Sequence, residues 1–341
     1  MASPPPLTVA VTGPTGDIGV AVVNALERSR RVKKIVGMAR RPFDPAERGW
    51  KKTEYRRGDV QDAASVRDLV KGTDAVVHLA FIILTASDTT HALNVEGSRR
   101  VFEEAAKAGV ERICYASSVA AYGFHEDNPD WLTEDIPARG SPEHPYSQQK
   151  AEVERVLSEV LLRRRKTVAY AFRPCIVAGP GAQTLLEEIP YYRLSDAMPE
   201  TVRGVLSSMP ILKPVIPDPG TPFQLVHEDD VASAFVAGVL GKGEPGPYNL
   251  AGRGTLTASD LAEALGWYSV PVPGLAVDAA AEVASRLPLM PSAVAWLHSV
   301  RKPVLMKTDR ARKELGWRPK HTAKATLSQL VEAHRGEGRE R

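Results

Sequence analysis

The feature that most constrains the fold is a glycine-rich turn near the start of the chain, Thr12-Gly13-Pro14-Thr15-Gly16-Asp17-Ile18-Gly19. Residues 7–12 before it are rich in β-branched side chains, which predicts a strand, and residues 18–28 after it have the apolar spacing of a helix. Glycines in G-x-x-G-x-x-G permit a tight turn, a close approach of backbone to a phosphate, and close packing of helix on strand. The turn therefore predicts the first strand-helix unit of a parallel sheet.

Strand-like and helix-like segments continue to alternate after this turn. The pattern predicts strands at residues 35–39, 54–57, 75–80, 112–117 and 167–173, and helices at residues 63–71, 94–108 and 147–163. Strands that alternate with helices form a parallel sheet covered on both faces. We therefore expect an α/β fold with a Rossmann-like, doubly wound parallel sheet, and a ligand at the carboxyl ends of its strands.

Composition and charge exclude several other classes of protein. The 341 residues, 43% hydrophobic and 25% charged, can bury a large core, and the net charge is only +3. The basic run Arg163-Arg164-Arg165-Lys166 is interpreted as the exposed end of a helix and not as a nucleic-acid patch. Cys114 and Cys175 are expected in the core, and neither a disulfide framework nor a metal site is indicated. Without a signal-peptide pattern or an apolar stretch of roughly 18 residues, we expect a cytoplasmic protein with no nucleic-acid or membrane partner.

The turn predicts that a nicotinamide dinucleotide binds. The residues at the end of the second strand help to distinguish NAD from NADP. A carboxylate there accepts a hydrogen bond from the ribose 2'-hydroxyl of NAD, whereas an arginine meets the 2'-phosphate of NADP. Here Gly37-Met38-Ala39-Arg40-Arg41 offers no carboxylate. This favours NADP over NAD. The alternative is that Arg40 and Arg41 cap the strand end or stack on the adenine, which is compatible with NAD.

A second motif, Tyr146-Ser147-Gln148-Gln149-Lys150, follows Pro145. Tyr146 and Lys150 are one helical turn apart, so both project from one face of the predicted helix. An ammonium nearby is expected to lower the pKa of the phenol from about 10 toward working pH, so that the tyrosine can exchange a proton with a substrate. Ser118, at the end of a predicted strand, can bond the same substrate oxygen. We expect Ser118, Tyr146 and Lys150 to be the catalytic residues.

Taken together, the motifs resemble the extended short-chain dehydrogenases/reductases of the NAD-dependent epimerase/dehydratase family, over most of residues 7–325. Besides the two motifs above, the resemblance rests on Gly58-Asp59-Val60, His78-Leu79-Ala80-Phe81, Asn94-Val95-Glu96-Gly97, Tyr115-Ala116-Ser117-Ser118-Val119-Ala120-Ala121-Tyr122-Gly123, Arg173-Pro174 with Gly179-Pro180-Gly181, and Val226-His227-Glu228-Asp229-Asp230-Val231.

The resemblance implies roles for individual residues. Asp59 would contact the adenine amino group, Val60 would flank the adenine ring, and Lys150 would also hold the nicotinamide ribose. Ser117 is the alternative to Ser118 if the alignment is shifted by one residue. The family also implies a homodimer formed through a four-helix interface. The full set of expected cofactor contacts is Gly13, Thr15, Gly16, Asp17, Ile18, Gly19, Arg40, Arg41, Asp59, Val60, Leu79, Ala80, Ala116, Tyr146, Lys150, Pro174 and Ile176.

Three departures from the family pattern bear on the substrate. The segment Cys175-Ile176-Val177 lacks the asparagine with which nucleotide-sugar enzymes often bind their substrate, and Phe81-Ile82-Ile83-Leu84 is an apolar lining. Val119-Ala120 replace the acidic pair of dehydratases, so dehydration is not expected. We expect an oxidoreductase that interconverts a carbonyl and a secondary alcohol by hydride transfer on a small, largely apolar substrate. The substrate contacts would be Phe81, Ile82, Ser118 and Tyr146.

Two alternatives stay open at this point. A nucleotide-sugar 4-epimerase would use the same residues for a transient oxidation and retain its cofactor. A dinucleotide-sensing protein would bind without turnover, but such proteins commonly lose the tyrosine or the lysine that this chain keeps.

The pattern changes after Pro174. Residues 179–219 are rich in proline, residues 223–226, 231–240 and 248–251 return to the strand-helix pattern, and the chain from Thr257 onward looks mainly helical. We therefore expect a dinucleotide-binding domain over residues 1–178 and 220–252. A smaller, mainly helical substrate-binding lobe would comprise residues 179–219 and 253–335.

Overall fold

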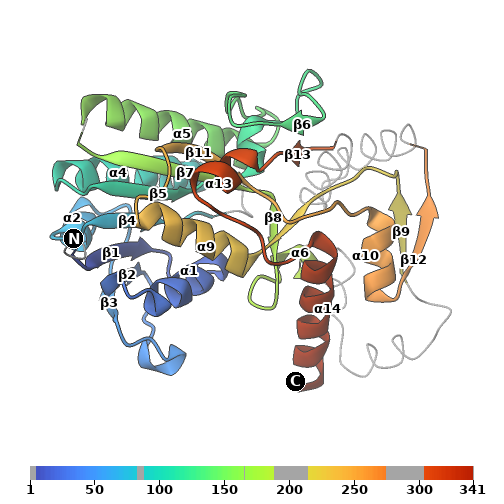
Figure 1. Cartoon of the computed structure of the whole chain (residues 1–341), viewed down its shortest axis with the longest axis horizontal. Helices are drawn as coiled ribbons and strands as arrows, with labels where there is room; N and C mark the ends of the chain where they lie inside the picture. The colour runs from blue at the N-terminus through green and yellow to red at the C-terminus, as the bar shows by residue number, and fades with distance from the viewer. Residues whose placement is uncertain (1–4, 83–87, 165, 188–213, 274–302, 341) are drawn as a thin grey trace.

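The computed structural model describes residues 5–82, 88–164, 166–187, 214–273 and 303–340 (Figure 1). The expected apolar lining residues Ile83 and Leu84 lie outside the described residues, as do residues 188–213 and 274–302 of the expected second lobe. Among the helices described, none combines the length and the apolar character needed to cross a bilayer.

A seven-stranded sheet, in the order β11-β7-β5-β4-β1-β2-β3, forms the body of the protein. Every neighbouring pair in it is parallel. The chain runs outward from β1 through β2 to β3, returns to β4 on the other side of β1, and continues outward through β5 and β7. This reversal confirms the doubly wound α/β fold. The strands are β1 Leu7–Thr12, β2 Val32–Ala39, β3 Thr53–Arg57, β4 Ala75–His78, β5 Arg112–Ala116, β7 Val168–Pro174 and β11 Gly246–Leu250.

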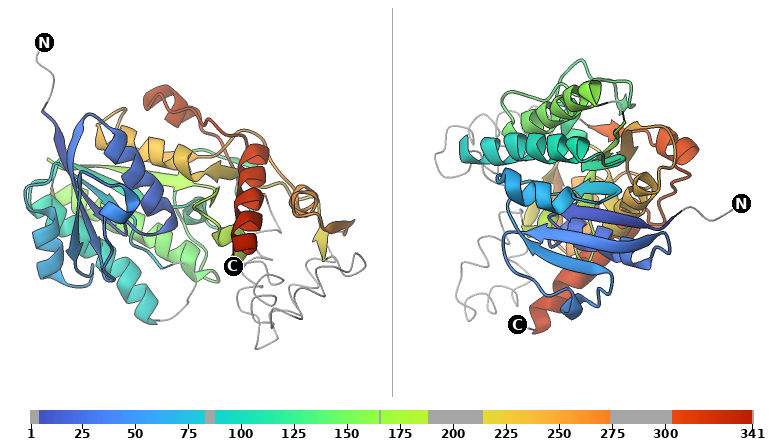
Figure 2. Two further views of the ribbon diagram at one scale, coloured as in Figure 1. Left: turned by 90° about the horizontal axis from the view of Figure 1, so that it is seen from below. Right: turned by 90° about the vertical axis from the view of Figure 1, so that its left-hand side faces the viewer.

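Helices cover both faces of this sheet (Figures 1 and 2). On one face lie α1 Asp17–Arg28 and α9 Glu228–Val239; on the other lie α2 Ala63–Val70, α4 Gly97–Lys107 and α5 Pro145–Arg163. The expected boundaries differ by three residues at the starts of β2, α4 and α9. At the start of α4 a π-helical turn, Ala92–Glu96, precedes the α-helix.

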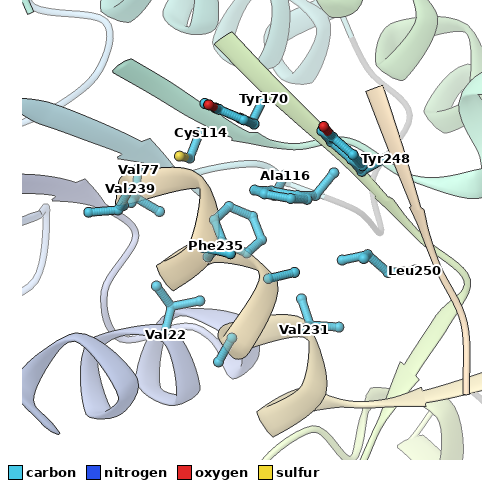
Figure 3. Packing of buried hydrophobic residues seen from close by; sticks show 14 of the residues in the cluster. Val22, Val77, Cys114, Ala116, Tyr170, Val231, Phe235, Val239, Tyr248 and Leu250 are labelled. Atoms are coloured by element: carbon cyan, nitrogen blue, oxygen red, sulfur yellow. The ribbon is translucent and has the colours of Figure 1, made fainter. Parts of the chain in front are cut away.

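The two cores follow from the alternation of side chains along each strand. In β1, Val9 and Val11 belong to the core under α1 and α9, whereas Ala10 belongs to the core under α4 and α5. Figure 3 shows the first core, in which Phe235 of α9 packs among side chains from the sheet and from α1. The cysteines confirm the expectation of buried apolar positions, since Cys114 and Cys175 are free and buried.

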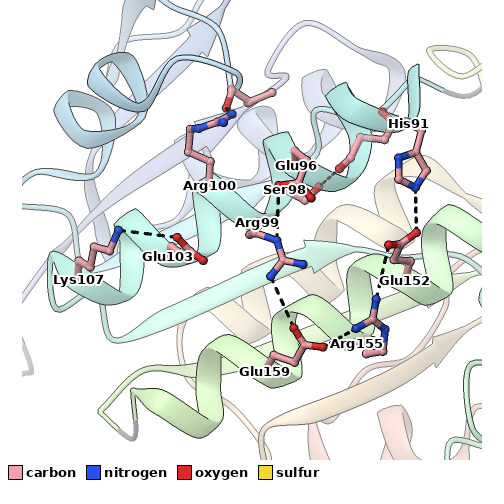
Figure 4. Close-up of polar contacts among 12 residues, drawn as sticks. His91, Glu96, Ser98, Arg99, Arg100, Glu103, Lys107, Glu152, Arg155 and Glu159 are labelled. Carbon is pink, nitrogen blue, oxygen red and sulfur yellow. Dashed lines mark hydrogen bonds and ion pairs between the residues drawn. The ribbon is translucent and has the colours of Figure 1, made fainter. Parts of the chain in front are cut away.

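Exposed charges join α4 to α5 on their outer surface (Figure 4). Arg99 lies 3.6 Å from Glu159, and His91 of α3 Asp88–His91 lies 3.0 Å from Glu152. Arg155 contacts both Glu152 and Glu159 along α5, at 3.5 Å and 2.5 Å. Partly exposed pairs of this kind contribute about 0–1 kcal/mol each. The position of α5 on the sheet therefore depends mainly on its buried face.

A third hydrophobic cluster lies beyond the ends of the strands, where α6 Thr184–Glu187, α10 Ala258–Leu265 and α14 Ala323–Glu340 pack together. The described residues after Thr257 are mainly helical, as expected, but they also include two short strands. Strand β12 Tyr268–Pro271 pairs with β9 Val215–Asp218, and β13 Leu305–Met306 pairs with β6 Trp131–Leu132. Each partner is distant in sequence, so the local pattern does not contain the pairing. The remaining elements are β8 Ile176–Ala178, which pairs with β10 Leu225–His227, and α13 Asp309–Glu314.

Candidate active site

Most residues expected to contact the cofactor follow the carboxyl ends of the parallel strands. The glycine turn follows β1, Arg40 and Arg41 follow β2, Asp59 and Val60 follow β3, Leu79 and Ala80 follow β4, and Ala116 and Pro174 end β5 and β7. Because all these strands run in the same direction, their carboxyl ends lie along one edge of the sheet. The fold thus brings residues from six chain segments to the edge where ligands of such sheets bind. The contacts themselves stay a prediction.

The three glycines of the turn differ in their surroundings. Gly13 has a φ of 71°, and a Cβ there would lie 3.0 Å from the Ala80 nitrogen. A Cβ on Gly19 would lie 2.8 Å from the carbonyl carbon of Pro14, so α1 could not pack so closely. Gly16 differs, because the nearest atom to its Cβ position would be 3.8 Å away.

Gly16 is also the N-cap of α1, and no side chain caps the first amide groups of this helix. Uncapped amides at a helix N-terminus carry partial positive charge and are suited to bind phosphate oxygens. The absence of a close contact at Gly16 and the uncapped helix amides next to it fit the pyrophosphate of a dinucleotide. Thr15 and Asp17 are exposed at the same turn, and Ile18 is partly buried.

A buried hydrogen-bond network fixes the exit of β4 to the exit of β1. The Thr12 hydroxyl lies 2.7 Å from His78 Nδ1, and His78 Nε2 lies 2.9 Å from the Ser98 hydroxyl of α4. The amides of Leu79 and Ala80 donate to Thr12 Oγ1 at 3.3 Å. Burial, followed by the nearby Lys150, lowers the pKa of His78 to about 3. His78 is thus a neutral, hydrogen-bonded structural residue.

The residues expected to hold the adenosine half are more open. Arg40 and Arg41 are exposed, and neither forms an ion pair with any of the described residues. Asp59 is partly buried and accepts a hydrogen bond from the Gln61 amide at 2.9 Å. Val60 is buried under Gly97, where an added Cβ would meet it at 2.8 Å.

The α5 helix that carries Tyr146 and Lys150 begins on the sequence signal expected for it. Pro145 occupies the first turn, where its missing N–H costs nothing. The Ser147 hydroxyl donates to the Ala120 carbonyl at 2.6 Å and accepts from the Ser141 amide at 3.0 Å. The start of α5 is thereby fixed to the loop that follows β5.

Three successive residues, the last residue of β5 and the two that follow it, contact three turns of α5. The Ala116 carbonyl accepts from the Lys150 ammonium at 2.7 Å, and the Ser117 hydroxyl donates to Glu154 Oε1 at 2.5 Å. The Ser118 side chain lies close enough to Tyr146 to lower the pKa of its phenol, and it accepts a hydrogen bond from the Ala120 amide at 3.2 Å. The structure thus brings the three expected catalytic residues together. Ser118 contacts Tyr146, whereas Ser117, the alternative, contacts Glu154.

Burial dominates the electrostatics of Lys150. Its side chain is only 3% exposed, and its Nζ lies 3.6 Å from the centroid of the Phe81 ring. Burial lowers the pKa of Lys150 to about 7, and the charge of Glu154 opposes the shift. The lysine can therefore change charge near neutral pH.

The expectation for the pKa of Tyr146 was wrong for this structure. Burial raises the pKa of the phenol above its ordinary value, and the nearby Ser118 side chain only partly offsets this. Lys150 does not offset this burial; its ammonium donates to the Ala116 carbonyl and lies over the Phe81 ring. The distance from Lys150 Nζ to the Tyr146 ring centroid is 5.6 Å.

Two of the expected substrate contacts adjoin these side chains. The rings of Phe81 and Tyr146 meet edge to face at 5.7 Å and 87°. The Ile82 amide donates to Asn94 Oδ1, and the Ile82 carbonyl accepts from Asn94 Nδ2, both at 2.8 Å. Phe81 therefore lies beside Tyr146, and the backbone of the next residue, Ile82, is fixed to Asn94. Farther along the edge, Pro174 is buried, and Ile176 is 39% exposed at the start of β8.

Sequence reasoning missed four residues around the site, of which Asn94, Gln149 and Arg173 are buried and Glu154 is partly buried. Asn94 Nδ2 also donates to Gln149 Oε1 at 2.8 Å, and Glu154 forms an ion pair with Arg173 of β7. Glu154 could have been found from its spacing, because it lies one helical turn after Lys150 on the same face. Arg173 and Asn94 occur in quoted motifs, but only the tertiary structure gives their partners.

A family model and several known proteins match this chain. A sequence model described as the NAD dependent epimerase/dehydratase family matches residues 9–251. The UDP-glucose 4-epimerase of Neisseria meningitidis serogroup B is 26% identical over 272 residues, which are 75% of this chain and 79% of the relative.

Two further relatives match about half of each chain. Sterol demethylase protein B of Methylococcus capsulatus is 30% identical over 181 residues, 51% of this chain and 52% of the relative. Mouse 3 beta-hydroxysteroid dehydrogenase type 7 is 28% identical over 205 residues, 53% of each. The crystal structure of gox2253 matches with a TM-score of 0.71 and 25% identity, covering 97% of this chain and 99% of the other.

Proposed function

The chain belongs to the NAD-dependent epimerase/dehydratase family, and from this premise we propose that it is an NADP-preferring oxidoreductase. The reaction would interconvert a carbonyl and a secondary alcohol on a small, largely apolar substrate. A bound nicotinamide would supply or accept the hydride. The observation that carries the proposal is the convergence of Ser118, Tyr146 and Lys150 beside the apolar ring of Phe81.

Each of the three side chains has one task in this proposal. When hydride reaches a carbonyl carbon, the oxygen needs a proton, and the Tyr146 hydroxyl supplies it; the alcohol returns the proton to Tyr146 in the reverse direction. A raised pKa keeps this phenol protonated at neutral pH. The Ser118 hydroxyl orients the substrate oxygen. The Lys150 ammonium compensates the charge that develops on Tyr146 and would hold the nicotinamide ribose.

The preference for NADP rests on Arg40 and Arg41. Both are exposed at the end of β2 with no ion-pair partner among the described residues, and no carboxylate is present there to accept from a ribose hydroxyl. A 2'-phosphate would give these guanidinium groups a charge-assisted contact. The uncapped start of α1 would hold the pyrophosphate of either cofactor.

An apolar substrate is supported by the surroundings of Tyr146. The Phe81 ring packs against it, and sugar hydroxyls placed against this ring would lose water without gaining partners. The names of two relatives specify a sterol demethylase protein and a hydroxysteroid dehydrogenase. A fused-ring or aromatic ketone is the substrate class that this combination supports.

A nucleotide-sugar 4-epimerase is the second candidate, because the UDP-glucose 4-epimerase relative aligns over 75% of this chain, more than the steroid relatives do. Such an enzyme would purify with its cofactor and show no net turnover of added nucleotide. A dinucleotide sensor without turnover is the third, and it would gain support only if binding were found with no reaction at all.

One experiment separates these functions. Purified protein is incubated with NADPH or NADH and a panel of hydrophobic ketones while absorbance of the reduced cofactor is followed, and melting temperatures are recorded with the same ketones and with UDP-glucose. We expect net oxidation of NADPH with a hydrophobic ketone. A larger thermal shift with UDP-glucose, together with a cofactor that survives purification, would favour the epimerase.

We further propose a cytoplasmic homodimer in which α4 and α5 pair with the same helices of a second copy. The two helices lie side by side, and their outer surface carries the charges drawn in Figure 4. Light scattering after size exclusion should give a mass twice the 37.0 kDa of one chain. A monomer that retains activity would contradict the dimer but not the reaction.

A further inference from the structure

We propose, as a consequence of the oxidoreductase function above, that the Glu154–Arg173 pair positions the relay and holds Lys150 in its charged form. Glu154 would be a positioning residue, since it acts through Lys150 and Ser117 and not on the substrate. The family match and the motif spacing do not assign this role. It follows from the contacts behind the three catalytic side chains.

Glu154 is the point at which three elements meet. Its carboxylate accepts from Ser117 Oγ at 2.5 Å, from Arg173 Nε at 2.9 Å and from Arg173 Nη2 at 2.5 Å. The side chains of Arg173 and Glu154 are 5% and 12% exposed. A two-pronged, buried ion pair of this kind fixes the orientation of both side chains. It therefore fixes α5 against the residue before Ser118 and against β7.

Arg173 is itself held from the other side. Its guanidinium lies 4.5 Å from the centroid of the Tyr122 ring, and the Tyr122 hydroxyl donates to Asn249 Oδ1 of β11 at 2.8 Å. The Glu154 carboxylate is thus anchored to the neighbouring strands of the sheet. Movement of α5 along the sheet would break these contacts together.

Among the described titratable groups around the Lys150 ammonium, Glu154 supplies the negative charge. Tyr115 of β5, whose ring centroid is 5.1 Å from Nζ, has a pKa raised well above its ordinary value by burial and stays neutral. Tyr146, on α5 itself, also has a raised pKa and stays neutral. His78 of β4 has a pKa of about 3 and is neutral. Burial drives Lys150 toward its neutral form, and the carboxylate of Glu154 opposes this.

The arrangement predicts opposite effects for the two partners of the pair. Without the Glu154 carboxylate, Lys150 loses its counter-charge and remains near an unpaired Arg173, so its pKa must fall. Without the Arg173 guanidinium, the Glu154 carboxylate is no longer neutralised by Arg173. Its negative charge then stabilises charged Lys150 more strongly, so the pKa of Lys150 must rise. A purely structural role would not give two changes of opposite sign, because either substitution breaks the same ion pair.

The test uses the full chain labelled with lysine carrying ¹³C at Cε, with the Lys150 signal assigned from its loss in Lys150→Arg. The signal is titrated by NMR in wild type, Glu154→Gln, Arg173→Met and the double variant. We expect the pKa of Lys150 to fall by about one pH unit in Glu154→Gln, to rise in Arg173→Met, and to return near the wild-type value in the double variant. The double variant replaces the ion pair by two uncharged side chains. It can still be titrated if a single variant fails to fold.

Glu152→Gln is the matched control. It removes the same charge from the same helix, but Glu152 pairs with His91 and Arg155 on the outer surface. The Lys150 titration should be unchanged in this control. A Lys150 pKa that stays constant in all variants, or that shifts in the same direction in both single variants, would overturn the inference.

The kinetic consequence is tested on the same proteins. If charged Lys150 supports turnover, kcat/KM falls as pH rises through its pKa, and this limb should move to lower pH in Glu154→Gln while KM for NADPH changes little. Failure of the proposed function can be distinguished from failure of this inference. If no ketone is reduced by the wild type, the proposed function fails while the NMR titration still decides the role of Glu154.

Discussion

The ammonium of Lys150 donates to the carbonyl oxygen of Ala116 at 2.7 Å, which ties the middle of α5 to the last residue of β5. The same contact holds the ammonium over the face of Phe81, 3.6 Å from the ring centroid. A cation held in this way is largely removed from water.

The proton relay is tested by Tyr146→Phe. The variant keeps the ring against Phe81 but has no hydroxyl to give or take a proton, so turnover should fall by roughly 10² or more. The affinity for NADPH, measured by fluorescence titration, should stay close to that of wild type. Tyr268→Phe, at an exposed position, serves as the control. Full activity in Tyr146→Phe would remove Tyr146 from the relay.

Cofactor preference is tested by Arg40→Ala, alone and combined with Arg41→Ala. A charge-assisted contact to a phosphate contributes about 1.5–3 kcal/mol, so affinity for NADP should fall by one to two orders of magnitude while affinity for NAD changes little. Lys33→Ala removes an exposed charge at the opposite end of the same strand and should affect neither cofactor. Equal losses for NADP and NAD would show that the arginines bind a shared part, such as the adenine.

The glycine turn is tested by comparing Gly16→Ala with Gly19→Ala. A Cβ at Gly16 meets no protein atom closer than 3.8 Å, so the free energy of unfolding should fall only by the cost of alanine relative to glycine at an N-cap, about 0.5–1 kcal/mol. Affinity for NADPH should nevertheless fall by tenfold or more, because the new methyl group occupies the space of the pyrophosphate. The Cβ of Gly19→Ala is 2.8 Å from backbone of Pro14 and should destabilise the fold by about 1–3 kcal/mol.

Urea unfolding and fluorescence titration measure both quantities for the two variants. If Gly16→Ala binds NADPH as tightly as wild type, the pyrophosphate lies elsewhere.

The buried lysine predicts a pH-dependent difference in stability between wild type and Lys150→Met. Lys150 has a pKa of about 7 in the folded protein and about 10.4 in the unfolded chain. The unfolded state therefore binds more protons between these values, and the free energy of unfolding rises with pH across this window. Below about pH 7 the full penalty of a few kcal/mol is present, and it is gone above about pH 10.

Lys150→Met has no such penalty, so it should gain stability relative to wild type near neutral pH and lose that relative gain toward alkaline pH. Urea unfolding of the cofactor-free proteins at about pH 6.5 and about pH 9.5 measures the difference. Other groups titrate equally in both proteins and cancel in the comparison. A difference that does not depend on pH would contradict a lowered lysine pKa.

The order of strands and helices could be predicted because each element has a local signal. β1 is found at the expected residues, and α1 begins directly after Gly16. The spacing of Tyr146 and Lys150 placed both on one face of a helix, and the structure has them on α5. The two short strands in the mainly helical end of the chain were not expected, because β12 and β13 pair with strands that lie far away in the sequence.

By itself, the sequence determined the features that depend on a few neighbouring residues: the glycine turn, the alternation of strands and helices, and the one-turn spacing of the relay. Only the tertiary structure decided the electrostatics of the site. Ser117 and Glu154 are 37 residues apart, and Glu154 and Arg173 are 19 apart. They meet because β5 lies beside β7 with α5 across both. Burial then reversed the expected pKa shift of Tyr146 and brought that of Lys150 to about 7, since desolvation depends on everything packed around a group and not on its neighbours in sequence.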